Sequence, residues 1–504
     1  MATPRSLAEA VRIRAEANPD GELVRVAGGT SDAAMRTAAG LYEHAEILAR
    51  GLARWIGPGA AVTTAVEPGT ATIALSTALS ILGAVEVALP AGTDRVDAHR
   101  LATATDSAAT LVAPARLAAQ PWLADLPART RLGTAPTTAL EQLDPHPLPH
   151  HRPQLETPAV VMLTSGTTGR TKGALLPNGA GLGQARRVQR AMAYTPEDAL
   201  LSFFPWQHVN ARHAAFLPAV ISGARLVVWP RFSASRFWQT AAAEGVTAFN
   251  FMGAVCAMLL RQPPGPHDRG HLVRRAYGGP APAEMVHAMA ERYGVRLRQA
   301  YACTELGDVA TTGAEIRPGA AGRPVPEYDV EVRAGELVVR PRVPALTAIE
   351  YVGDPEATAT AWRDGWFHTG DQARLDDGWL VVEGRSADVI RRRGISIGAS
   401  RIEDAVAQFG GVAEVAAIGV ESELTEDEVL VVVVPTTEGL TPAAIHAHCR
   451  DVLPRHAVPR FISIEPTLPR NQSLKVLRRI LRERGLPPDA WDAERPAPHQ
   501  QESP

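Results

Sequence analysis

The sequence predicts an α/β protein: a large N-terminal domain of doubly wound sheets with a small β subdomain, followed by a small α+β C-terminal domain. Strand-like apolar runs alternate with helix-like stretches between residues 158 and 251, which is the pattern of parallel, doubly wound sheets. From about residue 322 to 384, short strands are joined by glycine turns, as expected of a β subdomain. After Arg385 the order becomes helix, strand, strand and helix, which is typical of a compact α+β domain.

The individual elements follow in chain order. Up to about residue 150, Ala- and Leu-rich helices alternate with short strands; ALSTALSILGAVEVALP, for example, predicts a helix that leads into a strand. The Pro- and His-rich stretch Asp144–Pro158 is typical of a linker. The strands and helices expected after it lie at Pro158–Leu163, Leu200–Phe204, Arg225–Val228, Thr247–Phe251, Ile402–Phe409, Glu414–Val420, Glu428–Pro435 and Pro442–Val452.

Composition excludes several classes of protein. With 504 residues, 45% of them apolar and 21% charged, the chain is an ordinary globular protein of more than one domain. A net charge of −3 offers no basic stripe for nucleic acid. Cys256, Cys303 and Cys449 are too few and too scattered for a disulfide framework or a zinc site.

The sequence shows no export or membrane signal. The first residues lack the apolar segment that a secretory signal requires. The longest uncharged stretch, Pro68–Val85, carries Ser and Thr and is expected to form a buried helix. We therefore expect a cytoplasmic protein without stable membrane insertion and without a nucleic-acid partner, and a homodimer as the one macromolecular assembly left open.

Lysine is almost absent from the chain. Of the 51 basic residues, Lys172 and Lys475 are the two lysines and the rest are arginines. An ammonium group is a compact point charge that the planar guanidinium does not replace. These two lysines are therefore expected where arginine cannot serve.

A loop rich in glycine and hydroxyl groups, TSGTTGRTKG at residues 164–173, follows the strand expected at 158–163. Its glycines let backbone N–H groups converge on an anion, and its hydroxyl groups and lysine suit a polyphosphate. The lysine is preceded by Thr171 and followed by Gly173, so the Walker pattern of P-loop NTPases does not fit. The nucleotide-binding residues expected here are Thr164, Ser165, Gly166, Thr167, Thr168, Gly169 and Lys172.

This loop resembles the phosphate loop of the adenylate-forming superfamily, which contains acyl-CoA synthetases, nonribosomal-peptide adenylation domains and firefly-type luciferases. The resemblance extends from about residue 40 to 485 through several motifs in the family's order. The segments 200–215 and 385–404 are most similar to carnitine/crotonobetaine-type and fatty acyl-CoA ligases. The resemblance implies that a carboxylic acid reacts with ATP and Mg²⁺ to give an acyl-adenylate, which then forms a thioester with CoA.

The segment QAYACTE at residues 299–305 resembles the motif that holds the nucleotide in this family. The resemblance implies that Tyr301 stacks on adenine, with Ala300 and Ala302 beside it. Thr304 is expected to contact the α-phosphate and Glu305 to hold Mg²⁺. A lone carboxylate suits magnesium, which keeps most of its waters and binds the substrate's phosphates.

Three further segments resemble parts of the same site. WFHTGD at 366–371 implies that Asp371 binds both ribose hydroxyls, because two acceptor oxygens face a diol. Arg385 resembles the arginine that joins ribose and phosphate. YGGP at 277–280 resembles the strand end beside adenine and the acyl group, which adds Gly279 to the nucleotide site.

The segment LPRNQSLK at 468–475 resembles the C-terminal lysine motif, so Lys475 is expected to neutralise the carboxylate and the α-phosphate during adenylation. In this family a small C-terminal domain, here 389–485, rotates about a hinge at 385–388 relative to the N-terminal domain 1–384. Residues 486–504 are expected to be a disordered tail. After the rotation, CoA would meet Arg392, Arg393 and Gly394.

The acyl pocket of the family is formed by the gate motif, which FPWQH at 204–208 resembles, and by two strand ends. We expect His208 to stand between this pocket and the thiol tunnel, and to join Lys475, Thr304 and Glu305 as catalytic residues. The lining residues are mostly small and uncharged, which predicts a bulky or long hydrophobic acid. The expected lining consists of His208, Asn210, Phe251, Gly253, Gly278 and Gly279.

Four residues depart from the family pattern: Ala302 and Leu474 replace glycines, Ala387 stands at the hinge position, and Arg401 replaces a glutamate. These departures keep a second hypothesis open, in which the enzyme performs one half-reaction only, such as thioesterification of a preformed acyl-adenylate. A third hypothesis, of another class, is a non-catalytic adenylate-binding protein. A luciferase-like oxygenase is a fourth, because luciferases share these motifs.

Overall fold

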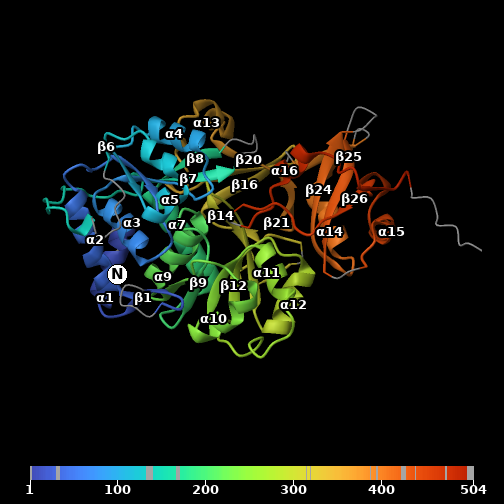
Figure 1. The fold of residues 1–504 in the computed structure, drawn as a ribbon, viewed down its shortest axis with the longest axis horizontal. Coiled ribbons are helices and arrows are strands. Elements are labelled where there is room, and N and C mark those ends of the chain that lie inside the picture. Colours follow the sequence, from blue (N-terminus) through green and yellow to red (C-terminus); the bar gives the residue numbers. More distant parts are fainter. Residues whose placement is uncertain are drawn as a thin grey trace, which may run out of the picture. The chain divides into compact units, whose positions relative to one another are not determined.

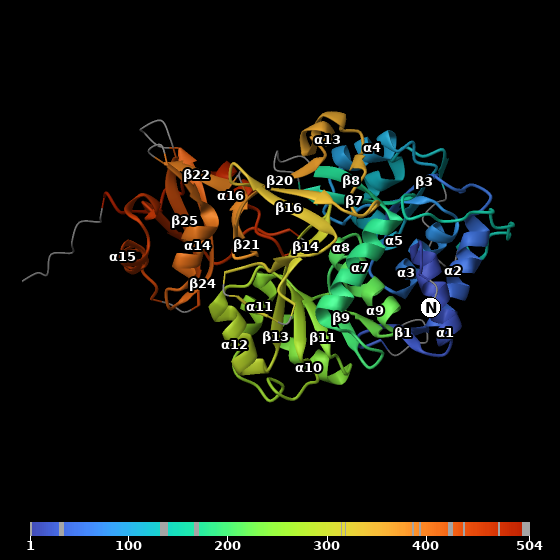
Figure 2. The same ribbon diagram turned by 180° about the vertical axis from the view of Figure 1, so that it is seen from behind.

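The computed structural model describes residues 3–29, 35–131, 140–165, 171–313, 315–317, 319–385, 388–392, 395–421, 427–436, 439–471 and 474–495. The chain forms two compact units (Figures 1 and 2). The N-terminal unit consists of residues 1–253, 264–330 and 339–368, and the C-terminal unit of residues 254–263, 331–338 and 369–504. The mixed α/β architecture, with a large N-terminal part and a β-rich C-terminal part, confirms the predicted fold class.

One sheet of the N-terminal unit has the strand order β15-β14-β13-β12-β11-β9-β10-β1-β2. Neighbours from β13 through β1 run parallel, whereas β14, β15 and β2 add antiparallel edges. Figure 2 labels β13, β11 and β9 of this sheet, in which β12 lies between β13 and β11. The bounds are β1 Glu22–Val26, β2 Met35–Thr37, β9 Ala199–Ser202, β10 Arg225–Val228, β11 Ala248–Phe251, β12 Arg275–Gly278, β13 Arg296–Cys303, β14 Gly307–Thr311 and β15 Arg323–Pro324.

The second sheet of this unit has the order β18-β8-β7-β4-β3-β5-β6. Strands β7, β4, β3, β5 and β6 are parallel, and β8 and β18 continue the sheet with antiparallel pairing. The phosphate-loop segment therefore connects two adjacent strands of one hairpin. The bounds are β3 Ala61–Ala65, β4 Val85–Ala88, β5 Ala109–Val112, β6 Thr130–Arg131, β7 Pro158–Ser165, β8 Thr171–Pro177 and β18 Glu350–Tyr351.

Helices pack between these two sheets in one continuous apolar core. Residues such as Leu41, Ile73, Val188 and Phe216 are fully buried there together with side chains of both sheets. The uncharged stretch from residue 68 forms a buried helix, as expected, and no helix in the described ranges is long and apolar enough to span a bilayer. The helices are α1 Leu7–Ala17, α2 Ala38–Leu52, α3 Thr70–Ile81, α4 Arg95–Ala104, α5 Pro114–Ala119, α7 Asn178–Met192, α8 Val209–Ala211, α9 Leu217–Ser222, α10 Phe237–Ala243, α11 Gly253–Leu260, α12 Ala283–Tyr293 and α13 Pro355–Ala361, with short turns η2 Pro121–Asp125, η3 Arg212–Phe216 (a π-helix) and η4 Ala234–Arg236.

The β subdomain predicted between residues 322 and 384 is a sheet of order β16-β17-β20-β19, to which β21 adds by pairing with β20. The two compact units divide within β20, between His368 and Thr369. The proposed hinge at 385–388 lies further along the chain and stays a prediction. The bounds are β16 Tyr328–Arg333, β17 Glu336–Pro341, β19 Trp362–Arg363, β20 Trp366–Asp376 and β21 Trp379–Arg385.

The C-terminal unit is built on a sheet of order β24-β25-β26-β27, which is apolar on both faces. Along β25, Val429, Val431 and Val433 enter one core, and the alternate residues Leu430 and Val432 enter the other, as the two-residue period of a strand requires. Strand β27 contains part of the segment from 486 that was expected to be disordered. The bounds are β22 Val389–Arg392, β23 Ile395–Gly398, α14 Ala399–Ala407, β24 Val412–Glu421, β25 Asp427–Pro435, α15 Pro442–Val452, η6 Arg455–Ala457, β26 Phe461–Ile464, α16 Arg478–Arg484 and β27 Trp491–Asp492.

Candidate active site

The hairpin of β7 and β8 brings the two ends of the glycine-rich loop together. Thr164 pairs with Lys172 and Ser165 with Thr171 across the hairpin. The guanidinium of Arg100 donates a hydrogen bond of 2.6 Å to the Thr171 carbonyl and so holds the start of β8. Gly166, Thr167, Thr168 and Gly169 lie outside the described residues.

Glu305 is buried and held in place by Tyr351. The carboxylate is 6% exposed, and its Oε1 accepts a hydrogen bond of 2.7 Å from the Tyr351 hydroxyl. The Glu305 carbonyl accepts a second bond of 2.6 Å from the Ala348 amide, which fixes the backbone. Charge-assisted hydrogen bonds of this kind restrict where a carboxylate can point.

Lys172 completes this group, because its Nζ lies 4.8 Å from the centroid of the Tyr351 ring. That distance is a cation–π contact, which holds the ammonium beside the phenol without neutralising it. Strand β18 places Tyr351 next to β8, opposite Ala174. Tyr351 could not be identified from the sequence, because it stands in none of the motifs and reaches Glu305 only through strand pairing.

The β13–β14 hairpin carries Ala300, Tyr301 and Ala302 on β13, and Thr304 lies in its turn, directly after β13. The pairing shifts by a bulge between Tyr301 and Ala302, which changes the register just before Glu305. Ala302 is exposed and does not have a positive φ, so an alanine fits this backbone where the family has glycine.

A buried polar network lies behind this hairpin. Asp308 accepts hydrogen bonds from the Tyr277 hydroxyl at 2.7 Å and from the Gln184 amide at 3.3 Å. Burial raises the pKa of Asp308, and the nearby Arg187 guanidinium opposes that rise. The network joins β12, β14 and α7, and thereby supports the backbone that carries Glu305.

Glycine is required at two of the expected acyl-pocket positions because the neighbouring backbone leaves no room for a side chain. A Cβ on Gly278 would lie 1.9 Å from the Phe251 carbonyl oxygen, and one on Gly253 would lie 2.6 Å from that of Pro280. Gly279 has a φ of +150°, a conformation that favours glycine. Phe251 is 1% exposed and therefore belongs to the core. These residues allow strand ends to approach closely, which is a different reason from the pocket room that the sequence suggested.

The gate segment is anchored by an amide pair. The side-chain amide of Asn250, on β11, donates 3.0 Å to the Asn210 side-chain oxygen and 2.9 Å to the Ala214 carbonyl. His208 stands directly before α8, and the Arg212 amide donates 3.3 Å to its carbonyl. Asn250 thus fixes Asn210, which stands two residues after His208. Asn250 lies near the carboxyl end of β11, and ligands of α/β sheets bind beside such strand ends.

In the C-terminal unit, Asp371 and Arg385 face each other across β20 and β21. They pair in register, and the Arg385 Nε lies 3.2 Å from the Asp371 Oδ1. Lys475 belongs to the same charge cluster. Loss of hydration lowers the pKa of Lys475, Arg385 lowers it further, and Asp371 raises it. The residue remains exposed, so solvent screens these effects.

Leu474, directly before Lys475, has a φ of +64°. A non-glycine residue in the left-handed region costs about 1–2 kcal/mol, since its Cβ crowds the following carbonyl. The glycine that the family has here is therefore a backbone requirement that this chain violates. The Asn471 side chain accepts a 2.9 Å bond from the Lys475 amide and helps to hold the turn.

Arg392 has a structural role that does not fit the CoA contact that the sequence predicts. It is 7% exposed, and its Nε lies 2.6 Å from the Glu428 Oε2. Its Nη1 donates to the carbonyls of His456 at 3.1 Å and Val458 at 2.9 Å. Its guanidinium is thus committed inside the C-terminal unit. Arg393, Gly394 and Ala387 lie outside the described residues, and Arg401 is exposed on α14.

Comparisons with known proteins agree with the motifs. The profile of the family "AMP-binding enzyme" matches residues 11–344, and that of "AMP-binding enzyme C-terminal domain" matches residues 401–475. A sulfoacetate–CoA ligase of Cupriavidus necator is 31% identical over 353 residues, which are 66% of this chain and 68% of that protein. A crotonobetaine/carnitine–CoA ligase of Proteus mirabilis is 30% identical over 362 residues, 67% of this chain and 69% of that one.

A third relative, from Rhodococcus jostii, is named a 3-[(3aS,4S,7aS)-7a-methyl-1,5-dioxo-octahydro-1H-inden-4-yl]propanoyl:CoA ligase and is 32% identical over 335 residues, 64% of each chain. Among solved structures, an anthranilate CoA ligase with anthranoyl-AMP superposes with a TM-score of 0.87 at 18% identity, covering 96% of this chain and 98% of that one. ATP-bound MatB from Rhodopseudomonas palustris gives 0.84 at 22% identity, covering 96% and 99%. These two superpositions establish the fold.

Replacing Tyr351 with Phe tests the link to Glu305. A hydrogen bond to a charged group contributes about 1.5–3 kcal/mol, so Tyr351→Phe is expected to raise the KM for MgATP by roughly tenfold or more. Steady-state kinetics with varied MgATP measure this. The matched control is Tyr194→Phe, because the buried Tyr194 hydroxyl has no hydrogen-bond partner within the described part of the chain. Equal kinetics for the two variants would contradict the role of Tyr351.

Substitutions at Leu474 test the strain before Lys475. Leu474→Gly relieves the left-handed conformation, whereas Leu474→Val imposes a β-branched side chain that adopts it poorly. We expect the free energy of unfolding of the C-terminal unit to be higher for the Gly variant than for the Val variant by about 1 kcal/mol. Urea unfolding followed by tryptophan fluorescence measures this difference. The opposite order would show that the strain is absent.

Proposed function

This chain belongs to the family of AMP-binding enzymes, and we propose that the acid it converts to a CoA thioester is bulky or long and hydrophobic. The enzyme is an acyl-CoA ligase. It activates a carboxylic acid with ATP through an acyl-adenylate and then forms the thioester with CoA. The residue assignments below rest on one observation: of the two lysines of the chain, Lys172 lies at a candidate nucleotide-binding position and Lys475 at a candidate catalytic position.

In the first step a carboxylate oxygen attacks the α-phosphorus of ATP, and the bond to pyrophosphate breaks. Two anions must therefore meet, and fixed cations in a site sheltered from water reduce their repulsion. Lys172, positioned on Tyr351, is proposed to bind the phosphates, with Thr304 contacting the α-phosphate. Lys475 is proposed to neutralise the carboxylate and the α-phosphate. An ammonium suits this task because it presents its charge at one point.

The ribose and the base are assigned to two different groups of residues. Asp371 offers two acceptor oxygens to the ribose diol, and the ion pair with Arg385 orients the carboxylate. Tyr301 is proposed to stack on adenine at the bulge of β13, with Ala300, Ala302 and Gly279 beside it. In the second step the CoA sulfur attacks the acyl carbon and AMP leaves. We propose that His208 stands at the gate through which the thiol enters.

Magnesium fits the donor set at Glu305. Within the described ranges no three His, Cys, Asp or Glu residues converge as a metal cage, and a single buried carboxylate is what a nucleotide-bound Mg²⁺ requires. Tyr351 fixes one oxygen of Glu305, so the carboxylate is held in one orientation. Bound there, the ion would offset negative charge on the phosphates.

The proposed class of acid rests on charge. None of the expected acyl-pocket residues is an Asp, Glu, Lys or Arg, so a second charge on the acid would be buried without a partner. The Asn210–Asn250 amide pair instead offers hydrogen bonds to an uncharged polar group on an apolar body. The proposed acid therefore differs from the small charged acids for which two of the relatives are named. It is similar in kind to the bicyclic acid in the name of the Rhodococcus relative.

We also propose the cytoplasm as the location, which the three free cysteines support. An enzyme limited to thioesterification stays the second candidate, and Leu474 is the observation that favours it. A strained turn before Lys475 would slow the step that needs this lysine while leaving the second step intact.

Mass spectrometry of one mixed reaction tests these proposals. The enzyme is incubated with ATP, MgCl2 and a panel of acids, namely long-chain fatty acids, bicyclic propanoates, sulfoacetate, carnitine and acetate, with and without CoA. We expect acyl-AMP from a bulky hydrophobic acid without CoA, acyl-CoA with it, and loss of both products in EDTA. A preference for sulfoacetate, carnitine or acetate would contradict the proposed acid. Acyl-CoA formed only from supplied acyl-adenylates would establish the one-step enzyme.

A further inference from the structure

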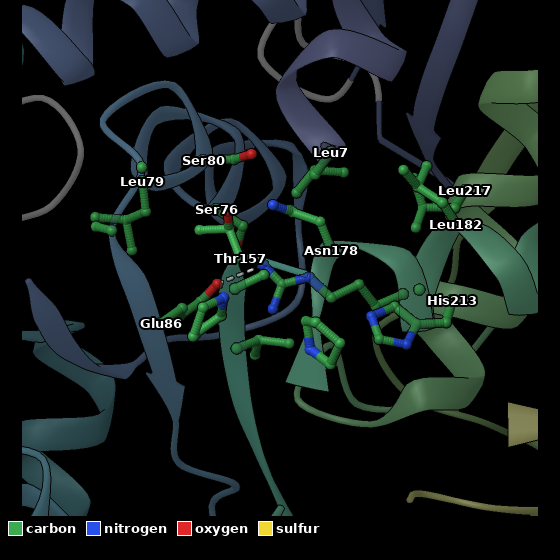
Figure 3. Close-up of a pocket in the computed structure, with 18 of the residues that line it drawn as sticks. Leu7, Ser76, Leu79, Ser80, Glu86, Thr157, Asn178, Leu182, His213 and Leu217 are labelled. Carbon is green, nitrogen blue, oxygen red and sulfur yellow. Dashed lines mark hydrogen bonds and ion pairs between the residues drawn. The ribbon is translucent and has the colours of Figure 1, made fainter. Parts of the chain in front are cut away.

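A cavity lies inside the N-terminal unit, where β4 and β7 begin (Figure 3). Its walls come from α1, α3, α7, η3 and α9 and enclose about 600 Å³, including the open mouth. Leu7, Leu79, Leu182 and Leu217 give it apolar walls. Figure 3 shows Glu86, Asn178 and His213 among the residues that line it.

This cavity is separate from the candidate active site. It is lined by Pro158 and Val160 at the start of β7, whereas the phosphate loop follows Ser165 at the end of that strand. The five residue steps from Val160 to Ser165 span roughly 17 Å at about 3.3 Å per residue. The cavity lining includes none of the expected acyl-pocket residues.

Arg212 in this cavity keeps one nitrogen, Nη1, without a hydrogen-bond partner among the described residues. It is 4% exposed, and its Nη2 forms an ion pair with Glu86, whose other oxygen accepts 2.8 Å from Thr64. The guanidinium carbon lies 5.2 Å from the centroid of Trp206. The buried Nη1 has no hydrogen-bond acceptor anywhere in the described residues. An unsatisfied buried donor costs about 1–3 kcal/mol, more when charged, so the cavity is suited to a ligand that supplies an acceptor.

The N-terminus of α7 lies on the same cavity. This helix of 15 residues begins at Asn178 without a side-chain cap. The amides of Asn178 and Gly179 donate to the carbonyls of Thr157 and Leu155, at 3.0 and 2.8 Å. The following first-turn amides keep their partial positive charge, which favours an anion.

The charge balance of the cavity disfavours an anion with more than one charge. Glu86 already neutralises Arg212. Burial and the adjacent Arg212 lower the pKa of His213 to about 3, so its imidazole is neutral near pH 7. His151 is the other titratable group of the lining. Because Glu86 and Arg212 neutralise each other and His213 is neutral, the positive charge left for a ligand is the partial charge at the N-terminus of α7, roughly half an elementary charge. A phosphate dianion would exceed that charge by more than a carboxylate does and would face Glu86 with it.

We propose that this cavity is a second binding site, which takes a small molecule with an apolar body and a single carboxylate. The carboxylate accepts from Arg212 Nη1 near the first turn of α7, and the apolar body packs on the leucines. Two elements of the cavity wall are continuous in the chain with the candidate active site: β7 ends at the phosphate loop, and η3 follows the gate segment. The π-helical form of η3 fits this assignment, since π-helical turns occur frequently at functional sites. The proposal is independent of which acid the enzyme activates.

Fluorine NMR at Trp206 tests the proposal, because Trp206 contacts Arg212 and donates 2.8 Å to Ser76 in the cavity wall. The full chain is labelled with 5-fluorotryptophan, and the Trp206 signal is assigned with Trp206→Phe. Sodium benzoate is the probe, benzamide its neutral isostere, and sodium phosphate the bare anion. Two variants alter the cavity: Ala159→Phe fills it, and Glu86→Gln with Arg212→Met removes both charges together, which avoids an unpaired buried charge.

We expect benzoate to shift the Trp206 signal saturably at millimolar concentration, with benzamide and phosphate at least tenfold weaker. Both folded variants are expected to lose the saturable shift. Equal binding of benzamide or phosphate, or a shift that persists in the folded variants, would overturn the proposal. If a variant fails to fold, the anomalous bromine signal of wild-type crystals soaked in 4-bromobenzoate decides: bromine in the cavity supports the site, and bromine only elsewhere refutes it.

Discussion

The hydrogen bond from Tyr351 to Glu305 joins three segments that are far apart in the sequence. Tyr351 lies on an edge strand, Glu305 lies in the turn of the β13–β14 hairpin of the other sheet, and Lys172 lies in the phosphate-loop hairpin and over the tyrosine ring. The two sheets of the N-terminal unit could pack on each other in many ways. This contact requires the arrangement in which a cation and a carboxylate both contact one phenol.

This arrangement explains why lysine is retained at two positions of a chain that otherwise uses arginine. A guanidinium is a planar fork that forms bidentate bonds, as Arg478 does with Glu403, where Nη2 lies 2.6 Å from Oε2. Arginine therefore serves in the ion pairs of the C-terminal unit and in the cavity beside Glu86. The proposed role of Lys475 is different, because its charge must lie close to a carboxylate and a phosphate at once, which suits a compact ammonium group. We infer that this difference retains lysine at two positions in a chain that otherwise uses arginine.

The sequence predicted the fold class, the order of elements and the nucleotide motifs, because those depend on local patterns of apolar residues and glycines. It could not identify Tyr351, whose role depends on which strand pairs with β8. It predicted a CoA contact for Arg392, whereas the structure pairs this residue with Glu428. The sequence alone does not distinguish an exposed arginine from a buried one. It also explained Gly278 by pocket size, whereas the Phe251 carbonyl leaves no room for a Cβ. Each difference arises from contacts between residues distant in the chain.

The central claim is that the enzyme performs two steps and needs Lys475 in the first of them only. ATP–pyrophosphate exchange measures the first step, and AMP release from a synthetic acyl-adenylate with CoA measures the second. The account predicts that Lys475→Ala reduces exchange by at least a hundredfold and leaves the second step within a few-fold of wild type. Equal loss of both steps, or exchange that survives the substitution, would contradict it.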